Sequence, residues 1–408
     1  MCKKSNLNLH QLYIEYIMRN TFILFCLIWL VGCTNQPKAP TDSTLPVLDL
    51  TKDYPKMEID IHDIADVEYV ALETTDESLL GYDLLYAISD KYIVSLGTVV
   101  DPVIHIFDRK GKYLSKIDRY GKGPEEYVNI YNTSIDFDNE ECYVYDWNRQ
   151  QIQVYTFTGQ WVRTIKTKEE FIYRHMFNYN QQYLIAHNNL HDYNNVKNFP
   201  DDKRPYHLID KKTGKHTSLD LVIENKVSRT LRKGHDAFES MLIIRTIVAN
   251  DKDMLIADFG LDTLYQYKEN KLVPIAVQYP PVHSDDEPLI IAPEIYTDSY
   301  LFFKPVRMRY VPDDVLKPYW DAPYLMWNRK TNAIMEVTKW KDVNYPNERN
   351  GRFRMIDQCN LPNNIHFRYD AEKLCEKYEA GILKGELKEV ASKLKFDDNP
   401  VIVICKLK

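Results

Sequence analysis

The sequence predicts an all-β protein made of repeated antiparallel sheets, and three observations lead to this fold class. The chain has 30 Tyr and 15 Phe against only 13 Gly, and aromatic residues favour the half-buried surface of a strand. Residues 104–117 match residues 152–165 at an offset of 48 positions, and each copy has a turn glycine, Gly111 or Gly159. Apolar alternation on both sides of such a turn is typical of a β-hairpin. Helical periodicity is rare before residue 370.

The two hairpins belong to larger repeating units. Strands at residues 84–89 and 91–96 precede the first hairpin, and strands at residues 133–137 and 141–146 precede the second. Each unit is therefore a four-stranded meander, which is one blade of a β-propeller. Weaker copies of the hairpin lie at residues 206–216, 254–275 and 324–337. With blades of roughly 45 to 60 residues, the ~360 residues that follow the leader and tether predict six blades.

A propeller ring must close, because an open edge strand is a template for aggregation. The last apolar run, at residues 400–407, has no hairpin partner of its own in the sequence. We expect it to enter the same blade as the N-terminal strand at residues 67–72. The two ends of the chain would then be fastened together.

Two regions interrupt the repeat. Residues 278–320 are rich in Pro and Asp, which predicts a long excursion between blades. Residues 371–394 have helix-forming composition and helical spacing of apolar residues, although Gly381 and Gly385 weaken the middle. We expect a short helical insertion before the closing strand, as one helix or a broken pair packed on a rim. A covering role is favoured over a partner-binding role.

The N-terminus predicts a lipid anchor. The apolar run at residues 21–31 follows Arg19 and is shorter than the roughly 20 residues that span a bilayer, as in a signal peptide. Gly32 and Cys33 end a lipobox, in which small residues allow cleavage before a cysteine that carries acyl chains. Met18 is an alternative start of the chain.

The sequence therefore divides into three regions. They are a signal peptide at residues 1–32, the lipidated Cys33 with a flexible tether at residues 33–46, and a six-bladed propeller at residues 47–408. The tether is rich in Thr, Asn, Pro and Ser, as flexible linkers are. We expect the periplasmic face of the outer membrane, because Thr34 replaces the Asp that directs inner-membrane retention and no acidic cluster follows as for surface export.

Composition excludes some classes of function. The net charge of -7 leaves no basic face for nucleic acid, and no nucleic-acid-binding motif occurs. The cysteines beyond the leader, which are Cys142, Cys359, Cys375 and Cys405, have no metal-ligand spacing. Their disulfide status stays open, although a cysteine in an apolar strand such as Cys405 is typical of a small buried hydrophobe.

Several segments together resemble a known family. They are residues 67–81, 104–108, 111–114, 120–127 and 397–408. In these the chain is similar to uncharacterised six-bladed β-propeller lipoproteins, which are related in fold to NHL-repeat and TolB-like propellers. Asp118 stands where such sequences more often have Gly. The resemblance implies architecture and anchoring, and it implies no activity because the family has none established.

The best candidate site is the segment at residues 119–127, which connects two blades. We expect such loops to lie around the central opening of the ring. Gly121 and Gly123 allow backbone amides to approach a ligand. The candidate ligand-binding residues are Arg119 and Lys122 for an acidic group, Tyr120 and Tyr127 for stacking, and Glu125 and Glu126. The alternative is that the segment only meets the conformational needs of the crossing between blades.

Other motifs do not predict chemistry. Adjacent Glu125 and Glu126 cannot flank a glycosidic bond from opposite sides. The acidic stretch at residues 136–141 lacks the Gly and distal Glu of an EF-hand loop. His187 and His191 have the spacing of a zinc pair but lack the intervening Glu and a helical context. No G-x-S-x-G nucleophile motif occurs, so we predict no metal and no cofactor.

These observations favour a non-catalytic binding or scaffold module. It would act as a monomer, held to the membrane by its lipid, with a glycan, a peptide or an envelope protein as partner. The alternative is a hydrolase or lyase acting on a polysaccharide or peptide, with a site assembled from several blades. The tryptophans suited either to sugar stacking or to packing between blades are Trp147, Trp161, Trp320 and Trp327.

Overall fold

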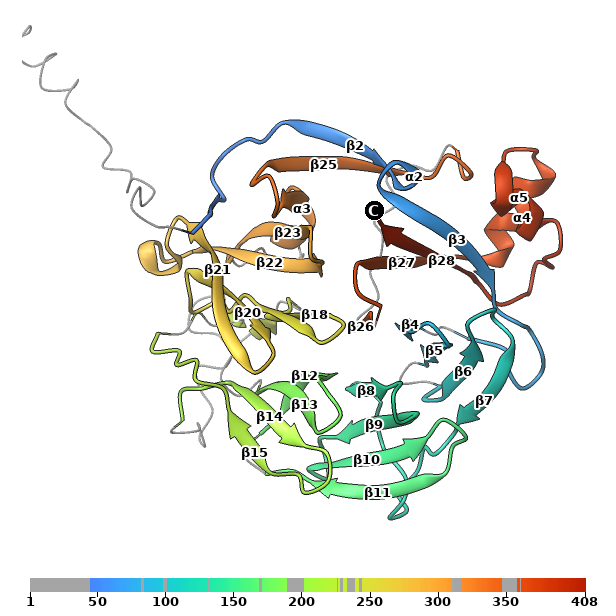
Figure 1. Ribbon diagram of the computed structural model, residues 1–408, viewed down its shortest axis with the longest axis horizontal. Helices are drawn as coiled ribbons and strands as arrows, with labels where there is room; N and C mark the ends of the chain where they lie inside the picture. The colour runs from blue at the N-terminus through green and yellow to red at the C-terminus, as the bar shows by residue number, and fades with distance from the viewer. Residues whose placement is uncertain are drawn as a thin grey trace, which may run out of the picture. The chain divides into compact units, whose positions relative to one another are not determined.

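The computed structural model of the protein describes residues 45–408 with gaps. The gaps are residues 82–83, 98–100, 131, 169–170, 189–201, 226, 228–229, 233–238, 242–243, 310, 312–316, 347–357 and 360. The described residues form one compact unit, in which six β-sheets are arranged as blades around a common centre (Figure 1). The predicted six-bladed β-propeller is therefore confirmed.

The first three blades follow the repeat found in the sequence. Blade 1 contains β4 (Leu84–Ile88), β5 (Tyr92–Leu96), β6 (Ile104–Asp108) and β7 (Tyr113–Ile117). Blade 2 contains β8 (Thr133–Asp136), β9 (Glu141–Asp146), β10 (Gln151–Thr156) and β11 (Trp161–Lys166). Blade 3 contains β12 (Tyr173–Asn178), β13 (Tyr183–Asn188), β14 (Tyr206–Asp210) and β15 (His216–Ser218). In blades 2 and 3 the first strand lies nearest the centre, whereas in blade 1 a further short strand, described below, lies inside β4.

The other three blades depart from the four-stranded pattern. Blade 4 contains β18 (Ile247–Asn250), β19 (Asp253–Ile256), β20 (Thr263–Lys268) and β21 (Lys271–Tyr279), with β1 (Val47–Asp49) on its outer edge. Blade 5 contains β22 (Leu289–Tyr296), β23 (Tyr300–Arg307), β24 (Leu325–Asn328) and β25 (Ile334–Lys341), with β2 (Lys56–Asp60) outside. Among the residues that the structure describes, blade 6 contains three strands, which are β27 (Asn364–Tyr369), β28 (Val401–Leu407) and β3 (Ala65–Ala71).

The turn glycines of the repeat are required by contact with the preceding blade. Gly111 and Gly159 both have positive φ, 84° and 80°, which glycine adopts without steric cost. A Cβ atom at Gly111 would lie 2.1 Å from the carbonyl oxygen of Ala71, and one at Gly159 would lie 2.8 Å from that of Lys116. Each hairpin turn therefore abuts the outer strand of the blade before it, which explains why glycine recurs at this position.

Both ends of the chain meet in blade 6. β28 pairs with β3 antiparallel, from Val401 opposite Ala71 to Leu407 opposite Ala65. This confirms the predicted closure of the ring. β28 also has a second partner, β27, which the sequence pattern did not indicate.

The N-terminal strands also fasten the neighbouring blades. β1 lies parallel to β21 and β2 lies parallel to β25. Together β1, β2 and β3 run along the outside of blades 4, 5 and 6, and Figure 1 shows β2 and β3 in blue on this rim. We call these three strands the N-terminal strap.

The predicted excursion at residues 278–320 is wrong. The middle of this region forms β22 and β23, the two inner strands of blade 5. Proline hid this pattern, because Pro293 lies in β22 and Pro305 lies in β23. The register of the pair shifts between Pro293 and Ile295, which is a β-bulge that accommodates the missing amide hydrogen. Outside these strands lie η3 (Val282–Ser284) and α3 (Lys317–Asp321).

The predicted helical insertion is confirmed as a broken pair. α4 (Ala371–Glu379) and α5 (Gly385–Ala391) lie between β27 and β28 on the outer rim (Figure 1). Gly381 and Gly385 both have positive φ and separate the helices. Leu374 and Leu387 are fully buried against the core of blade 6, so the helices cover the blade.

The centre of the ring contains a short strand of the protein itself. β26 (Gln358–Cys359) pairs in parallel with β4 and also lies against β18 of blade 4, on the opposite side of the ring (Figure 1). After β26 the chain reaches Asn363, whose side chain donates to Asp298 at 2.8 Å and whose backbone amide donates to Asn250 at 2.9 Å. The segment at residues 358–363 therefore joins blades 1, 4 and 5 through the centre.

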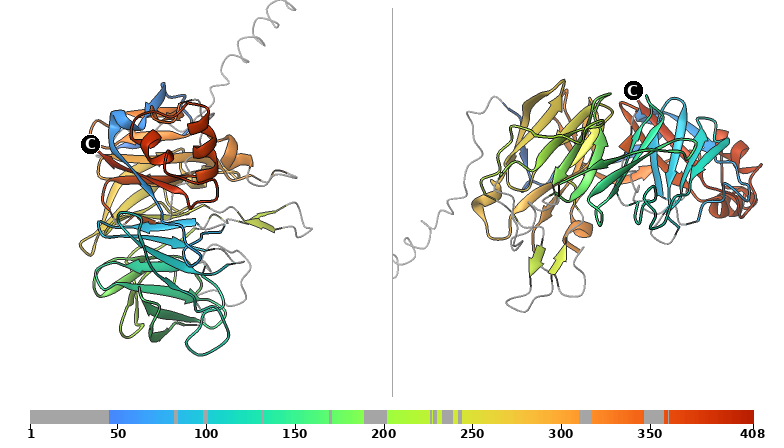
Figure 2. Two further views of the ribbon diagram at one scale, coloured as in Figure 1. Left: turned by 90° about the vertical axis from the view of Figure 1, so that its right-hand side faces the viewer. Right: turned by 90° about the horizontal axis from the view of Figure 1, so that it is seen from below.

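Two features lie apart from the blades. The hairpin of β16 (Thr230–Arg232) and β17 (Glu239–Met241) stands out of one face of the disc, and α3 stands out of the same face (Figure 2). The four-residue helix α2 (Ile61–Ile64) connects β2 to β3. In the described part of the chain, no helix combines the length and apolarity that a membrane span needs.

Candidate functional site

The candidate segment at residues 119–127 lies between blades 1 and 2. It is pinned at its end by Tyr127, which is fully buried. The Tyr127 hydroxyl donates to the carbonyl oxygens of Pro102 at 2.5 Å and Ile117 at 3.2 Å. Burial raises the pKa of this phenol well above its ordinary value. The prediction that Tyr127 stacks on a ligand is therefore wrong, because its ring belongs to the core of blades 1 and 2.

Glu126 holds the turn of the segment together. Its carboxylate accepts a hydrogen bond from the backbone amide of Gly123 at 2.6 Å. A Cβ atom at Gly121 would lie 2.0 Å from Oε2 of Glu126, so glycine leaves room for this carboxylate. Glu126 and the two glycines thus have the conformational role that the sequence offered as the alternative.

The backbone of the segment is held by blade 2. Arg149 donates from Nη1 to the carbonyl oxygens of Gly123 and Glu126, both at 2.9 Å. Gln153 donates to Pro124 at 2.8 Å, and the Tyr155 hydroxyl donates to Glu125 at 2.8 Å. These anchors lie on β10 and on the turn before it, so the segment crosses the third strand of the blade. The expectation that it borders the central opening is wrong.

The remaining candidate side chains face solvent. Tyr120 is 58% exposed, and Lys122 and Glu125 are exposed as well. Arg119 is exposed and donates from Nε to the carbonyl oxygen of Gly159 at 3.1 Å. A rigid backbone therefore carries two cations, one carboxylate and one phenol outward.

The four tryptophans considered for stacking divide into two groups. Trp327 is buried, and Trp161 packs against the core while donating to Gln153 at 2.9 Å. Trp147 and Trp320 are 46% and 39% exposed. Only the second pair has rings that can receive a ligand.

A cluster of side chains around α3 was not predicted from the sequence. The Tyr319 hydroxyl donates to Glu294, and Lys304 donates to the Tyr319 carbonyl oxygen at 2.9 Å. The Lys304 ammonium lies 4.5 Å from the Tyr319 ring and 5.9 Å from the Trp320 ring. We call Glu294, Lys304, Tyr319 and Trp320 the α3 cluster. Its members come from three elements, so no local spacing marks it.

A partly buried histidine–aspartate contact lies between blades 5 and 6. Nε2 of His62 is 3.0 Å from Asp342, whose side chain is only 2% exposed. Asp342 also accepts from the hydroxyls of Tyr69 at 2.8 Å and Tyr369 at 3.0 Å, and from the backbone amide of Asn344 at 2.8 Å. The carboxylate therefore has structural partners on all sides and joins both ends of the chain.

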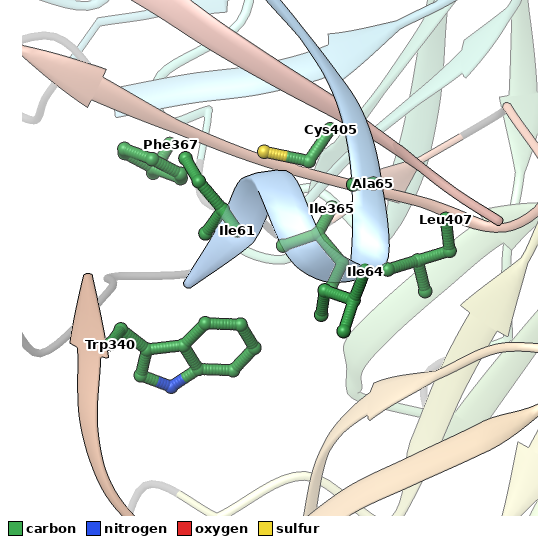
Figure 3. Close-up of a pocket in the computed structure, with 8 residues that line it drawn as sticks. All are labelled: Ile61, Ile64, Ala65, Trp340, Ile365, Phe367, Cys405 and Leu407. Atoms are coloured by element: carbon green, nitrogen blue, oxygen red, sulfur yellow. The ribbon is translucent and has the colours of Figure 1, made fainter. Parts of the chain in front are cut away.

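An apolar cavity lies beside this contact, between α2 and blade 6. Figure 3 shows Ile61 and Ile64 of α2 with Trp340 nearby. Its other lining residues are Ala65, Ile365, Phe367, Cys405 and Leu407. The volume is about 10 Å³, which is about one water molecule. It is therefore a packing defect rather than a ligand pocket.

The remaining residues singled out in the sequence add no site. Cys142, Cys375 and Cys405 are free thiols. His187 lies in β13, whereas His191 is outside the described residues. In the part of the chain that the structure describes, no three His, Cys, Asp or Glu side chains are grouped to hold a metal ion. Gly32 and Cys33 lie outside the described residues, so lipidation stays a prediction.

The fold defines the class of the protein as a six-bladed β-propeller closed by its two ends. The chain belongs to a family described as a domain of unknown function, DUF4934, whose model matches residues 45–406. No curated protein sequence matches the chain.

Two solved structures match the chain. One is a Bacteroides fragilis NCTC 9343 protein inferred to be exported, with 13% identity and a TM-score of 0.59 over 90% of this chain and 100% of that one. Another is a DUF4221 family member from Bacteroides vulgatus ATCC 8482, with 12% identity and a TM-score of 0.47 over 84% of this chain and 96% of that one. At these identities the likeness concerns the fold alone.

Proposed function

We propose that the protein is a non-catalytic binding module that a lipid anchor presents in the cell envelope. The observation that carries this proposal is the segment at residues 119–127, where a fixed backbone holds exposed side chains. Hydrogen bonds hold the backbone atoms of Gly121, Gly123, Pro124, Glu125, Glu126 and Tyr127 in place. A binding surface that is already ordered loses little conformational entropy when a ligand arrives.

The charges of this surface favour an acidic or amphipathic ligand. Arg119 and Lys122 can pair with an anionic group, and Tyr120 can stack on a sugar or a peptide side chain. Glu125 provides an acceptor nearby. We expect a glycan, a peptide or an envelope protein to bind here.

Location supports the same proposal. The sequence predicts a lipobox that ends at Cys33, whose acyl chains would hold the protein on a membrane, and a protein of the same fold is inferred to be exported. We propose that the protein lies on the periplasmic face of the outer membrane. Substitution Cys33→Ala should abolish metabolic labelling with palmitate, and continued labelling would refute the anchor.

The binding proposal is tested with the full chain in detergent micelles. It is applied to arrays of glycans and of peptides, and in parallel to libraries of chromogenic glycosides and peptides. We expect saturable binding to one class without turnover, and a loss of about tenfold or more in Tyr120→Ala and Lys122→Ala. Matched controls are Tyr378→Ala and Lys110→Ala, which are exposed on α4 and on the blade 1 hairpin turn. Turnover of any library member would replace the proposal by the hydrolase or lyase alternative.

A further inference from the structure

The α3 cluster lies on the face of the disc that carries the protruding elements. α3 and the β16–β17 hairpin stand out of this face (Figure 2). Tyr319 packs on an apolar cluster that includes Val227 and Ile244, the residues on either side of the hairpin. The two protrusions are therefore joined at their base, and Trp320 lies beside this junction.

The indole of Trp320 is exposed and its orientation is fixed. Trp320 as a residue is 39% exposed, and its ring meets the Tyr319 ring edge-on, with centroids 5.1 Å apart and planes at 74°. Tyr319 is held at its hydroxyl by Glu294 and at its carbonyl by Lys304. An aromatic ring fixed in this way gives contact area at low entropic cost.

The polar side chains of the cluster, Glu294 and Lys304, are held by strands of a β-sheet and not by a loop. Lys304 lies in β23 and is only 7% exposed. Glu294 lies in β22 at the bulge between Pro293 and Ile295, and bulges re-aim side chains. Groups on strands are held more firmly than groups on loops.

We infer that the α3 cluster is a subsite for a neutral oligosaccharide, with Trp320 as its stacking platform. This inference deepens the proposed binding function and rests on it. A sugar ring has an apolar face for the indole and hydroxyls for the phenol and carboxylate beside it. Glu294 and Lys304 offset each other in charge, which favours a neutral ligand over the anion suited to Arg119 and Lys122.

Isothermal titration of the full chain in detergent with cellohexaose, xylohexaose, mannohexaose and maltohexaose tests the inference. We expect at least one of the four to bind. Trp320→Ala should weaken that binding about 30-fold or more, as loss of a central aromatic contact does. Trp320→Tyr should recover part of it. Trp147→Ala, which removes the other exposed indole, should leave it unchanged.

Several outcomes would overturn the subsite. The first is that none of the four sugars binds. The second is that Trp320→Ala binds the sugar as tightly as the unchanged protein does. The third is that Trp147→Ala loses the sugar binding. The proposed function is separable, because array binding that falls in Tyr120→Ala but persists in Trp320→Ala supports the module and refutes the subsite. Near-ultraviolet circular dichroism shows whether Trp320→Ala retains its fold, and Trp320→Tyr decides the question if it does not.

Discussion

The boundary between blades 2 and 3 and the boundary between blades 5 and 6 each bury an aspartate, but they satisfy it differently. Asp136 and Lys211 form an ion pair of 2.6 Å with side chains 1% and 3% exposed. The partners of Asp342 in the described part of the chain are neutral hydroxyl and amide donors together with the imidazole of His62.

The two solutions differ in the separation of their partners along the chain. Lys211 follows Asp136 by 75 residues, within consecutive blades. Tyr69 and Asp342 are 273 residues apart. The comparison teaches that neighbouring blades can rely on a charge pair, whereas the closing boundary uses several donors drawn from both ends of the chain. Substitutions at the two boundaries should therefore destabilise the protein for different reasons.

Lys211→Met should have the largest effect. It leaves the Asp136 carboxylate buried without its cation, which typically costs about 3–5 kcal/mol of unfolding free energy. Burial already lowers the pKa of Lys211, although Asp136 opposes the shift. Urea unfolding at neutral pH measures the loss. The double variant with Asp136→Leu should recover most of it, because it removes the unpaired charge.

The matched control is Lys252→Met. Lys252 pairs with Asp138 at 3.2 Å, but both side chains are about half exposed. An exposed pair contributes roughly 0–1 kcal/mol. If Lys211→Met cost no more than this control, the buried pair would not hold blades 2 and 3 together.

Asp342→Asn should have the second largest effect. The amide keeps one acceptor oxygen but loses the charge that strengthens the bonds from Tyr69 and Tyr369, at a cost of about 2–3 kcal/mol. Hydrogen exchange should rise first in β3 and β28, because these strands close the ring. Asp285→Asn, at a half-exposed carboxylate paired with Arg307, is the control with little expected loss. Uniform exchange across all blades would contradict a special role for this boundary.

Acidification should have an effect that grows gradually as the pH falls and that is shared by both regions. Burial lowers the pKa of His216 in blade 3 to about 4 and that of His366 in blade 6 to about 3. The unfolded chain has ordinary values near 6.5, so it binds more protons below that pH. Stability is therefore full above pH 6.5 and falls as the pH drops toward 4 for His216 and 3 for His366.

The expected slope is about 1.4 kcal/mol per pH unit for each histidine. Urea unfolding between pH 7 and pH 5 measures it. His216→Leu and His366→Leu should each remove the contribution of one histidine, about 1.4 kcal/mol per pH unit, from this slope. This holds whatever each substitution does to the stability at pH 7. A slope unchanged in both variants would mean that other groups govern acid sensitivity.

The repeat and the closure could be predicted from the sequence because both depend on local pattern. Turn glycines such as Gly159 recur where the preceding blade leaves no room for a Cβ atom, so they mark each hairpin. The strand at residues 400–407 was recognisable because an apolar strand needs an edge to join. In contrast, Pro293 and Pro305 made blade 5 resemble a loop, since a bulge that accommodates proline has no sequence signature.

The candidate site was predicted only in part. Exposed Tyr120 and buried Tyr127 occupy the same short segment, and their difference arises from a hydrogen bond to Pro102 that sequence does not reveal. The α3 cluster depends on a lysine and a glutamate from neighbouring strands meeting a helix. Such convergence is set by packing, and spacing along the chain carries no trace of it.

The pairing of β3 with β28 determines how much of the chain must be synthesised before the ring can close. β3 ends at Ala71, and its partner begins at Val401, so a ribosome must add some 330 more residues before this edge is covered. At about 5–20 residues per second this takes roughly 15 to 65 seconds. Throughout that interval β3 lacks the strand that it pairs with, and the growing chain carries an open strand edge. Delivery of an unfolded chain, or a chaperone that shields the edge, therefore suits this topology better than folding during synthesis.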